Sequence, residues 1–283
     1  MFDHSDANPA VPSFLRLVVA VECSVVFVAG VLLFFLPGLA SELWAWTIPP
    51  FNSRFVGAVY LAAYIPLIIF WFVPRWSPGR LTLWMILTFT TLVMLAMLIH
   101  RDAFEWDRAA TFIFWLLYIF LPINSAIFLL RSRKAAGPGG FREPAALRIP
   151  LLIFGFLGGA YGLGLLLAPE ALTRFWPWQV DAFHGRMYAA AFVTPAVAAW
   201  ILSSTRGLPA DYLSLGLNLI AGGFLPVLGT LWTHIQVSVA RQIDFGSAGA
   251  WIFLSFFLVT GIFGIILTAV AAQWSNRTVV RPS

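Results

Sequence analysis

The chain has 283 residues, of which 60% are hydrophobic and only 10% are charged, and its formal net charge is +5. Soluble domains carry about 25% charged residues, so this composition excludes a water-soluble globular protein. The basic residues are scattered between apolar runs, which argues against a nucleic-acid-binding surface. The lipid bilayer is therefore the expected environment of the chain.

Eight continuous apolar runs are long enough, at about 20 residues, to cross a bilayer as helices. Helix is favoured because each backbone polar group in hydrocarbon has to be paired within its own segment. The sequence therefore predicts an all-α integral membrane protein with eight transmembrane helices. In chain order the runs are residues 14–36, 53–73, 81–100, 109–130, 149–168, 187–204, 212–233 and 249–272.

Lysine and arginine are distributed unevenly between the two sides of this arrangement. Of the 17 basic residues, 11 lie on the side that holds both termini and the other 6 lie on the opposite side. Because basic residues are retained on the cytoplasmic side, we expect both termini to be cytoplasmic. The membrane predicted for the protein is the plasma (inner) membrane.

One pattern occurs twice, at a constant spacing of 132 residues. Its first copy consists of Pro37, Trp44, Trp46, Phe51, Arg54 and Ala58, and its second of Pro169, Trp176, Trp178, Phe183, Arg186 and Ala190. The spacing predicts two tandem four-helix repeats in the same orientation, related by a pseudo-two-fold axis along the membrane normal. The expected organisation is a tail (1–13), the first repeat (14–130), a linker (131–148), the second repeat (149–273) and a second tail (274–283).

The repeated tryptophans and arginines allow two interpretations. In the first, the indoles anchor the protein at the lipid headgroups and each arginine snorkels or caps a loop. In the second, they form a paired outer vestibule that holds an anionic or amphiphilic ligand. The candidate ligand-binding residues are Trp44, Trp46, Arg54, Trp176, Trp178, His184 and Arg186.

Two histidines end the third and seventh apolar runs. His100 and His234 are 134 residues apart, close to the repeat spacing, so they are candidates for facing one another. Paired imidazoles ligate haem iron, chlorophyll magnesium or a transition metal. The alternative is that each imidazole only forms hydrogen bonds at a helix end. No metal-protease or haem-attachment motif accompanies them.

Glu22 is the only carboxylate well inside a predicted span. A charged group in hydrocarbon is costly and is by default a functional hypothesis, here a proton-coupled role. The alternative is a neutral carboxyl that is hydrogen-bonded to a neighbouring helix. Four glycines in the fifth span, Gly155, Gly158, Gly159 and Gly162, have the small-residue spacing that predicts close approach of another helix, first of all one from the same chain.

Three function classes follow. The leading one is a non-enzymatic membrane protein, which either binds a lipid or amphiphile or serves as an accessory subunit among other membrane subunits. It is favoured because nucleophile, phosphate-loop and dinucleotide motifs are missing from the sequence. The second is a small transporter that uses Glu22, Arg54 and Arg186. The third is a haem- or pigment-binding subunit with His100 and His234 as ligands.

Overall fold

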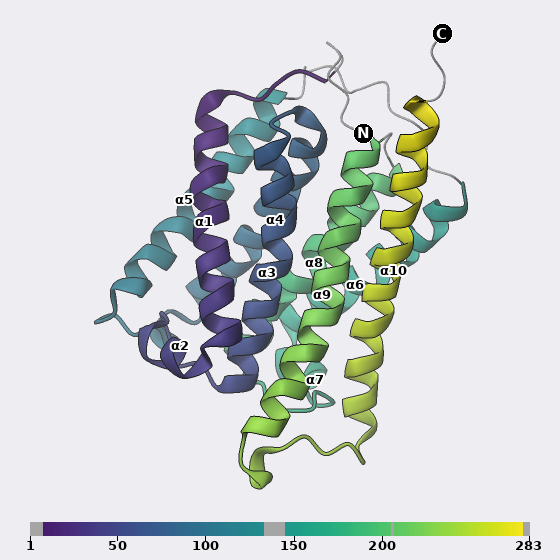
Figure 1. Ribbon diagram of the computed structural model, residues 1–283. Coiled ribbons are helices and arrows are strands. Elements are labelled where there is room, and N and C mark those ends of the chain that lie inside the picture. The colour runs from purple at the N-terminus through teal and green to yellow at the C-terminus, as the bar shows by residue number, and fades with distance from the viewer. Residues whose placement is uncertain (1–7, 133–144, 205–206, 280–283) are drawn as a thin grey trace.

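The computed structural model describes residues 8–132, 145–204 and 207–279. These residues contain eight long apolar helices, each long enough to cross a bilayer, as the sequence predicts (Figure 1). Their bounds are α1 Ser13–Phe35, α3 Pro50–Phe72, α4 Trp76–Ile99, α5 Ala109–Arg131, α6 Ala145–Leu167, α8 Ala182–Ser204, α9 Pro209–Gln236 and α10 Ala248–Val279. The chain is thus a multi-pass integral membrane protein that resides in a lipid bilayer.

The two spans that follow the repeated tryptophans begin earlier than the hydropathy of the sequence predicts. Helix α3 begins at Pro50 rather than at 53, and α8 begins at Ala182 rather than at 187. Their first two turns contain polar residues, which lower the local hydropathy, but Asn52, Arg54 and His184 are all buried. Arg54 and Arg186 therefore lie on membrane helices. Two short helices, α2 (Pro37–Leu43) and α7 (Pro169–Leu172), begin at the repeated prolines.

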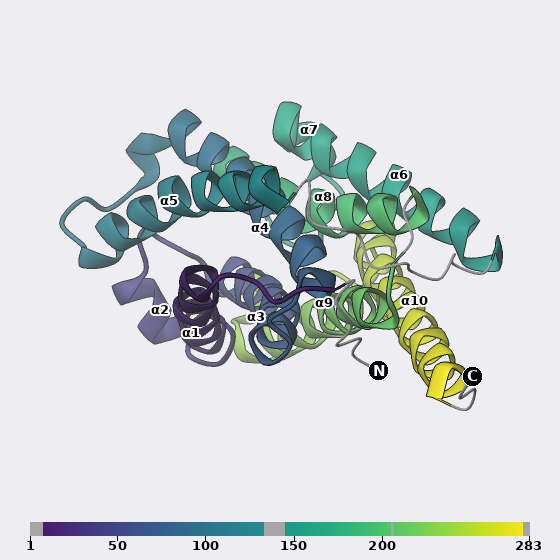
Figure 2. The same cartoon turned by 90° about the horizontal axis from the view of Figure 1, so that it is seen from above.

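The long helices pack in two layers of four. One layer has the order α5, α4, α8, α6, and the other has the order α1, α3, α9, α10 (Figure 2). Helix α3 packs extensively against α9 but only slightly against α4, its neighbour in sequence. Each layer therefore combines two helices that precede the linker with two that follow it.

Glycines allow the closest approaches within each layer. A Cβ atom on Gly162 of α6 would lie only 3.0 Å from the carbonyl oxygen of Ala189 on α8. Gly155 and Gly158 also face α8, which confirms that these small residues pack against a helix of the same chain. In the other layer, a Cβ on Gly223 of α9 would lie 2.3 Å from the backbone nitrogen of Gly261 on α10.

The close contact at Gly223 yields a prediction for stability. Gly223→Ala should destabilise the protein by about 1–3 kcal/mol, because the added methyl group overlaps the α10 backbone and forces the two helices apart. Gly38→Ala is the matched control, since nothing lies within 4 Å of the added Cβ there. That control should be neutral or slightly stabilising, because alanine favours helix over glycine. Thermal unfolding in detergent measures both, and equal melting temperatures for the two variants would contradict this packing.

Candidate functional site

Four tryptophans gather at one end of the bundle, called here the tryptophan end. The rings of Trp44 and Trp46 are nearly perpendicular with centroids 5.4 Å apart, and those of Trp176 and Trp178 repeat this geometry at 5.2 Å. Trp46 is only 1% exposed and Trp176 is also buried. These indoles therefore pack mainly against protein, which differs from the lipid-facing position that an interfacial anchor would take.

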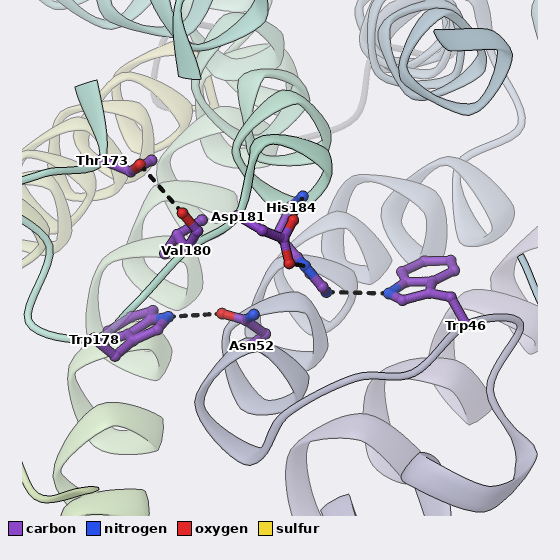
Figure 3. A network of polar contacts seen from close by, with 7 residues as sticks. All are labelled: Trp46, Asn52, Thr173, Trp178, Val180, Asp181 and His184. Atoms are coloured by element: carbon purple, nitrogen blue, oxygen red, sulfur yellow. Dashed lines mark hydrogen bonds and ion pairs between the residues drawn. The ribbon is translucent and has the colours of Figure 1, made fainter. Parts of the chain in front are cut away.

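Two indole N–H groups form hydrogen bonds that join the part of the chain before the linker to the part after it. Trp46 donates from Nε1 to Nε2 of His184 at 3.2 Å, and Trp178 donates from Nε1 to Oδ1 of Asn52 at 2.7 Å (Figure 3). Adding 132 to positions 46 and 52 gives 178 and 184, so the two contacts occupy corresponding positions. A buried indole N–H needs an acceptor, and here each acceptor comes from the other part of the chain.

Asp181 fixes the orientation of the His184 ring. Nδ1 of His184 lies 2.7 Å from Oδ2 of Asp181, and the His184 backbone N–H donates to Oδ1 at 2.8 Å. Since Nε2 accepts from Trp46, the proton of the neutral ring is on Nδ1 and is donated to Asp181. Burial alone would raise the pKa of Asp181, but the hydrogen bonds that it accepts from the His184 side chain and from the backbone N–H groups of His184 and Phe183 lower that pKa below its usual range.

Arg54 and Arg186 each bind the end of the preceding long helix. Arg54 donates from Nε to the carbonyl oxygen of Phe34, and Arg186 donates from Nε to that of Leu166, both at 3.1 Å. These carbonyls belong to the last turns of α1 and α6, where no intrahelical donor remains. The acceptors, like the arginines, are 132 residues apart.

The other N–H groups of each guanidinium reach across to another helix. Nη1 of Arg54 donates to Oγ1 of Thr233 at 2.9 Å, Nη2 donates to Gln236, and the guanidinium lies 4.6 Å from the ring centre of Trp232. Nη1 of Arg186 lies 2.7 Å from Nε2 of His100, at the end of α4. Neither arginine forms an ion pair with a carboxylate in the described part of the chain.

The environments of His100 and His234 differ. Burial, reinforced by the charge of Arg186 and opposed by Asp181, lowers the pKa of His100. His234 accepts through Nδ1 from the backbone N–H of Ile243 at 3.1 Å. The guanidinium beside His100 would repel a metal cation. Within residues 8–132, 145–204 and 207–279, no three His, Cys, Asp or Glu side chains are grouped to hold a metal ion. These contacts support the hydrogen-bonding interpretation of both histidines.

A cavity of about 250 Å³ lies between the two layers, with residues from all eight long helices in its wall. Most of the wall is apolar or aromatic, and no lysine, arginine or histidine from the described part of the chain contributes to it. Of the candidate residues, only Glu22 and Trp44 line the cavity. Its other polar residues are Tyr60, Thr82, Thr90, Tyr118, Thr194, Asn218 and Thr260.

The Glu22 carboxyl group is buried in this wall without a bonding partner. The residue is 7% exposed, and none of the hydrogen bonds or ion pairs among the described residues involves its side chain. Nearby, the hydroxyls of Tyr60 and Tyr118 are 2.7 Å apart and bond to one another. Thr194 also has a buried hydroxyl with no partner. The cavity thus contains polar atoms that the protein itself leaves unsatisfied.

Sequence reasoning identified Glu22 by its rarity but missed most of the residues around it. Tyr60 and Tyr118 gave no signal because aromatic residues are abundant throughout the chain. Asp181 was detectable, since it precedes α8 by one residue and binds the third backbone N–H of that helix, as an N-cap aspartate does. Comparisons with protein-family models, curated proteins and solved structures found no match for the chain.

The contact between His100 and Arg186 predicts a loss of stability in acid. Because the folded-state pKa of His100 lies below its ordinary value of 6.5, unfolding takes up a proton. The stability is complete above pH 6.5 and declines as the pH falls from there through the folded-state pKa. His100→Gln keeps an acceptor for Arg186 but cannot be protonated, so its melting temperature should fall less between pH 7.5 and pH 5. His234→Gln serves as the control and should retain the wild-type slope; equal slopes for wild type and His100→Gln would contradict the prediction.

Proposed function

We propose that this membrane protein binds a small lipophilic molecule in the cavity between its two helix layers and catalyses no reaction. The observation that supports this most directly is the cavity itself, which lies at membrane depth among all eight spans. Its volume of about 250 Å³ is close to the lower end of the range for ligand pockets, about 300–1,000 Å³. A mostly apolar wall with a few polar groups is typical of sites for such ligands.

A lateral route from the lipid is consistent with this function. Helices α1 and α5 lie at the same edge of the two layers, and their contact includes the stacked rings of Phe14 and Phe128. Farther along, Val25 of α1 and Ile113 of α5 both line the cavity while being 36% and 55% exposed. Because these side chains line the cavity and are also exposed on the outside of the bundle, entry between α1 and α5 would let a lipophilic molecule avoid water.

The experiment that tests this function fills the cavity with a larger side chain and measures whether a bound molecule is lost. Native mass spectrometry of protein extracted from its own membrane should reveal a small bound molecule. Ala191→Leu, which extends a cavity-lining side chain, should lower the occupancy at least several-fold. Ala269→Leu makes the same change at an exposed position of α10 and should retain the molecule. Equal occupancy in both variants, or an empty wild type, would refute the proposal.

A second candidate function, a small transporter, is favoured by one observation, the buried Glu22 carboxyl in the cavity wall. Arg54 and Arg186 do not add to it, because both bind helix ends and neither lines the cavity. Uptake into proteoliposomes distinguishes the two functions. A binder retains its ligand at a fixed stoichiometry, whereas a transporter accumulates it beyond the amount of protein.

We further propose that the eight spans are two tandem four-helix repeats, 14–130 and 149–273, related by a pseudo-two-fold axis through the cavity. Corresponding helix pairs support this: α1 packs on α3 as α6 packs on α8, and α3 packs on α9 as α8 packs on α4. The paired arginine–carbonyl and tryptophan–acceptor contacts support it as well. An even number of spans in each repeat gives both the same orientation.

Both termini are proposed to be cytoplasmic in the plasma membrane, which places the tryptophan end outside. Cysteine labelling tests this, because the single native cysteine is removed by Cys23→Ser. On that background, a membrane-impermeant maleimide should label Glu170→Cys, at an exposed position of the tryptophan end, in intact cells. Ser283→Cys should react only after lysis, and the reverse result would invert the topology.

A further inference from the structure

The charge of the cavity wall narrows the chemistry of its ligand. Among the described residues, Glu22 is the only ionisable acid or base of the Asp, Glu, Lys, Arg and His types that lines the cavity. An anionic ligand would therefore meet a carboxyl group and no cation. A purely apolar ligand would leave the Glu22 carboxyl as unpaired as it is now, at a cost typical of buried polar groups.

Aromatic rings line the same cavity as Glu22. Five lining residues form one connected cluster through their rings: Trp44, Tyr60, Phe89, Phe114 and Tyr118. The centroids of Phe114 and Tyr118 are the closest pair, at 4.3 Å. The faces of aromatic rings attract organic cations, most strongly where water is excluded.

We propose that the cavity takes a small lipophilic amine, with the ammonium group against Glu22 and the aromatic cluster, and the hydrocarbon part between the layers. This inference rests on the proposed binding function and specifies its ligand class. The ammonium donates hydrogen bonds to the Glu22 carboxylate, which supplies the partner that the described protein residues do not. In the low-dielectric cavity the two opposite charges attract far more strongly than in water.

The orientation of the ligand in the cavity follows from the residue that corresponds to Glu22. Adding 132 to position 22 gives Phe154, on α6, and Phe154 also lines the cavity. Glu22 thus provides an acidic wall on α1, while the corresponding position on α6 provides an apolar one. An amphiphilic cation fits this difference with its charged group towards α1 and its tail towards α6.

The test uses three probes with the same eight-carbon chain: octylamine, octanol and octanoate. Binding is measured by equilibrium dialysis against the wild-type protein in nanodiscs, with protein-free nanodiscs subtracted, at a pH where the amine is protonated. We expect octylamine to bind at least tenfold more tightly than either of the other two. Octanol binding as tightly as octylamine, or octanoate more tightly, overturns the inference.

Variants then assign the selectivity to its residue. Glu22→Gln should weaken octylamine binding at least tenfold and leave octanol within about twofold, whereas Glu170→Gln, at an exposed carboxyl group, should change neither. If Glu22→Gln does not fold, Glu22→Asp, which retains the charge, should keep a preference for the amine. If the three probes bind equally well and Ala191→Leu weakens the binding of all of them, the amine preference is refuted while the proposed binding function stands. If Ala191→Leu does not change the binding of any probe, both the amine preference and the proposed binding function are refuted.

Discussion

The need to pair the backbone carbonyl groups at helix ends inside hydrocarbon shapes the tryptophan end of this protein. Helices α1 and α6 each end with carbonyl groups that have no donor in their own helix. Arg54 and Arg186 supply that donor from the second turns of α3 and α8, and their remaining N–H groups bind the ends of α9 and α4. A planar guanidinium with several fixed donors can join three helices in this way, which a lysine ammonium with its flexible stem does less well.

The tryptophans extend the same principle to the contact between the two layers. Trp46 lies in the segment before α3 and bonds to His184 of α8, while Trp178 precedes α8 and bonds to Asn52 of α3. The layers are therefore joined firmly at this end, around buried rings. Away from it the wall is formed by smaller or apolar residues such as Ala62 and Ala190, and the layers enclose the cavity. The polar contacts that hold the layers together thus also leave the space between them free for a ligand.

Hydropathy predicted the eight helices because each span has to be apolar enough to enter the bilayer. It placed the starts of α3 and α8 too late, because a hydropathy scale scores every polar side chain as unfavourable in the membrane. Such a scale does not take into account that Arg54 is hydrogen-bonded inside the protein. The interleaving of the helices was not predictable, because it depends on which glycine and alanine faces meet, such as Gly162 with Ala189. The recurring residues drew attention to the tryptophan end, yet the acceptors His184 and Asn52 differ in type. Residue identity alone therefore did not reveal that they make corresponding contacts.

Under the proposed tandem repeat, the difference between Glu22 and Phe154 bears on how two corresponding halves acquire a directional site. Arg54 and Arg186 make the same contact with a preceding helix end, so a change in either would remove a bond on which the packing depends. Glu22 and Phe154 form no such bond among the described residues, and both line the cavity, so a change at either position breaks no hydrogen bond. Corresponding positions on α1 and α6 can therefore diverge while the contacts at the tryptophan end stay alike. Under the proposed symmetry, Glu22 on one side and Phe154 on the other give the cavity an acidic wall and an apolar wall, which an exactly symmetric protein could not provide.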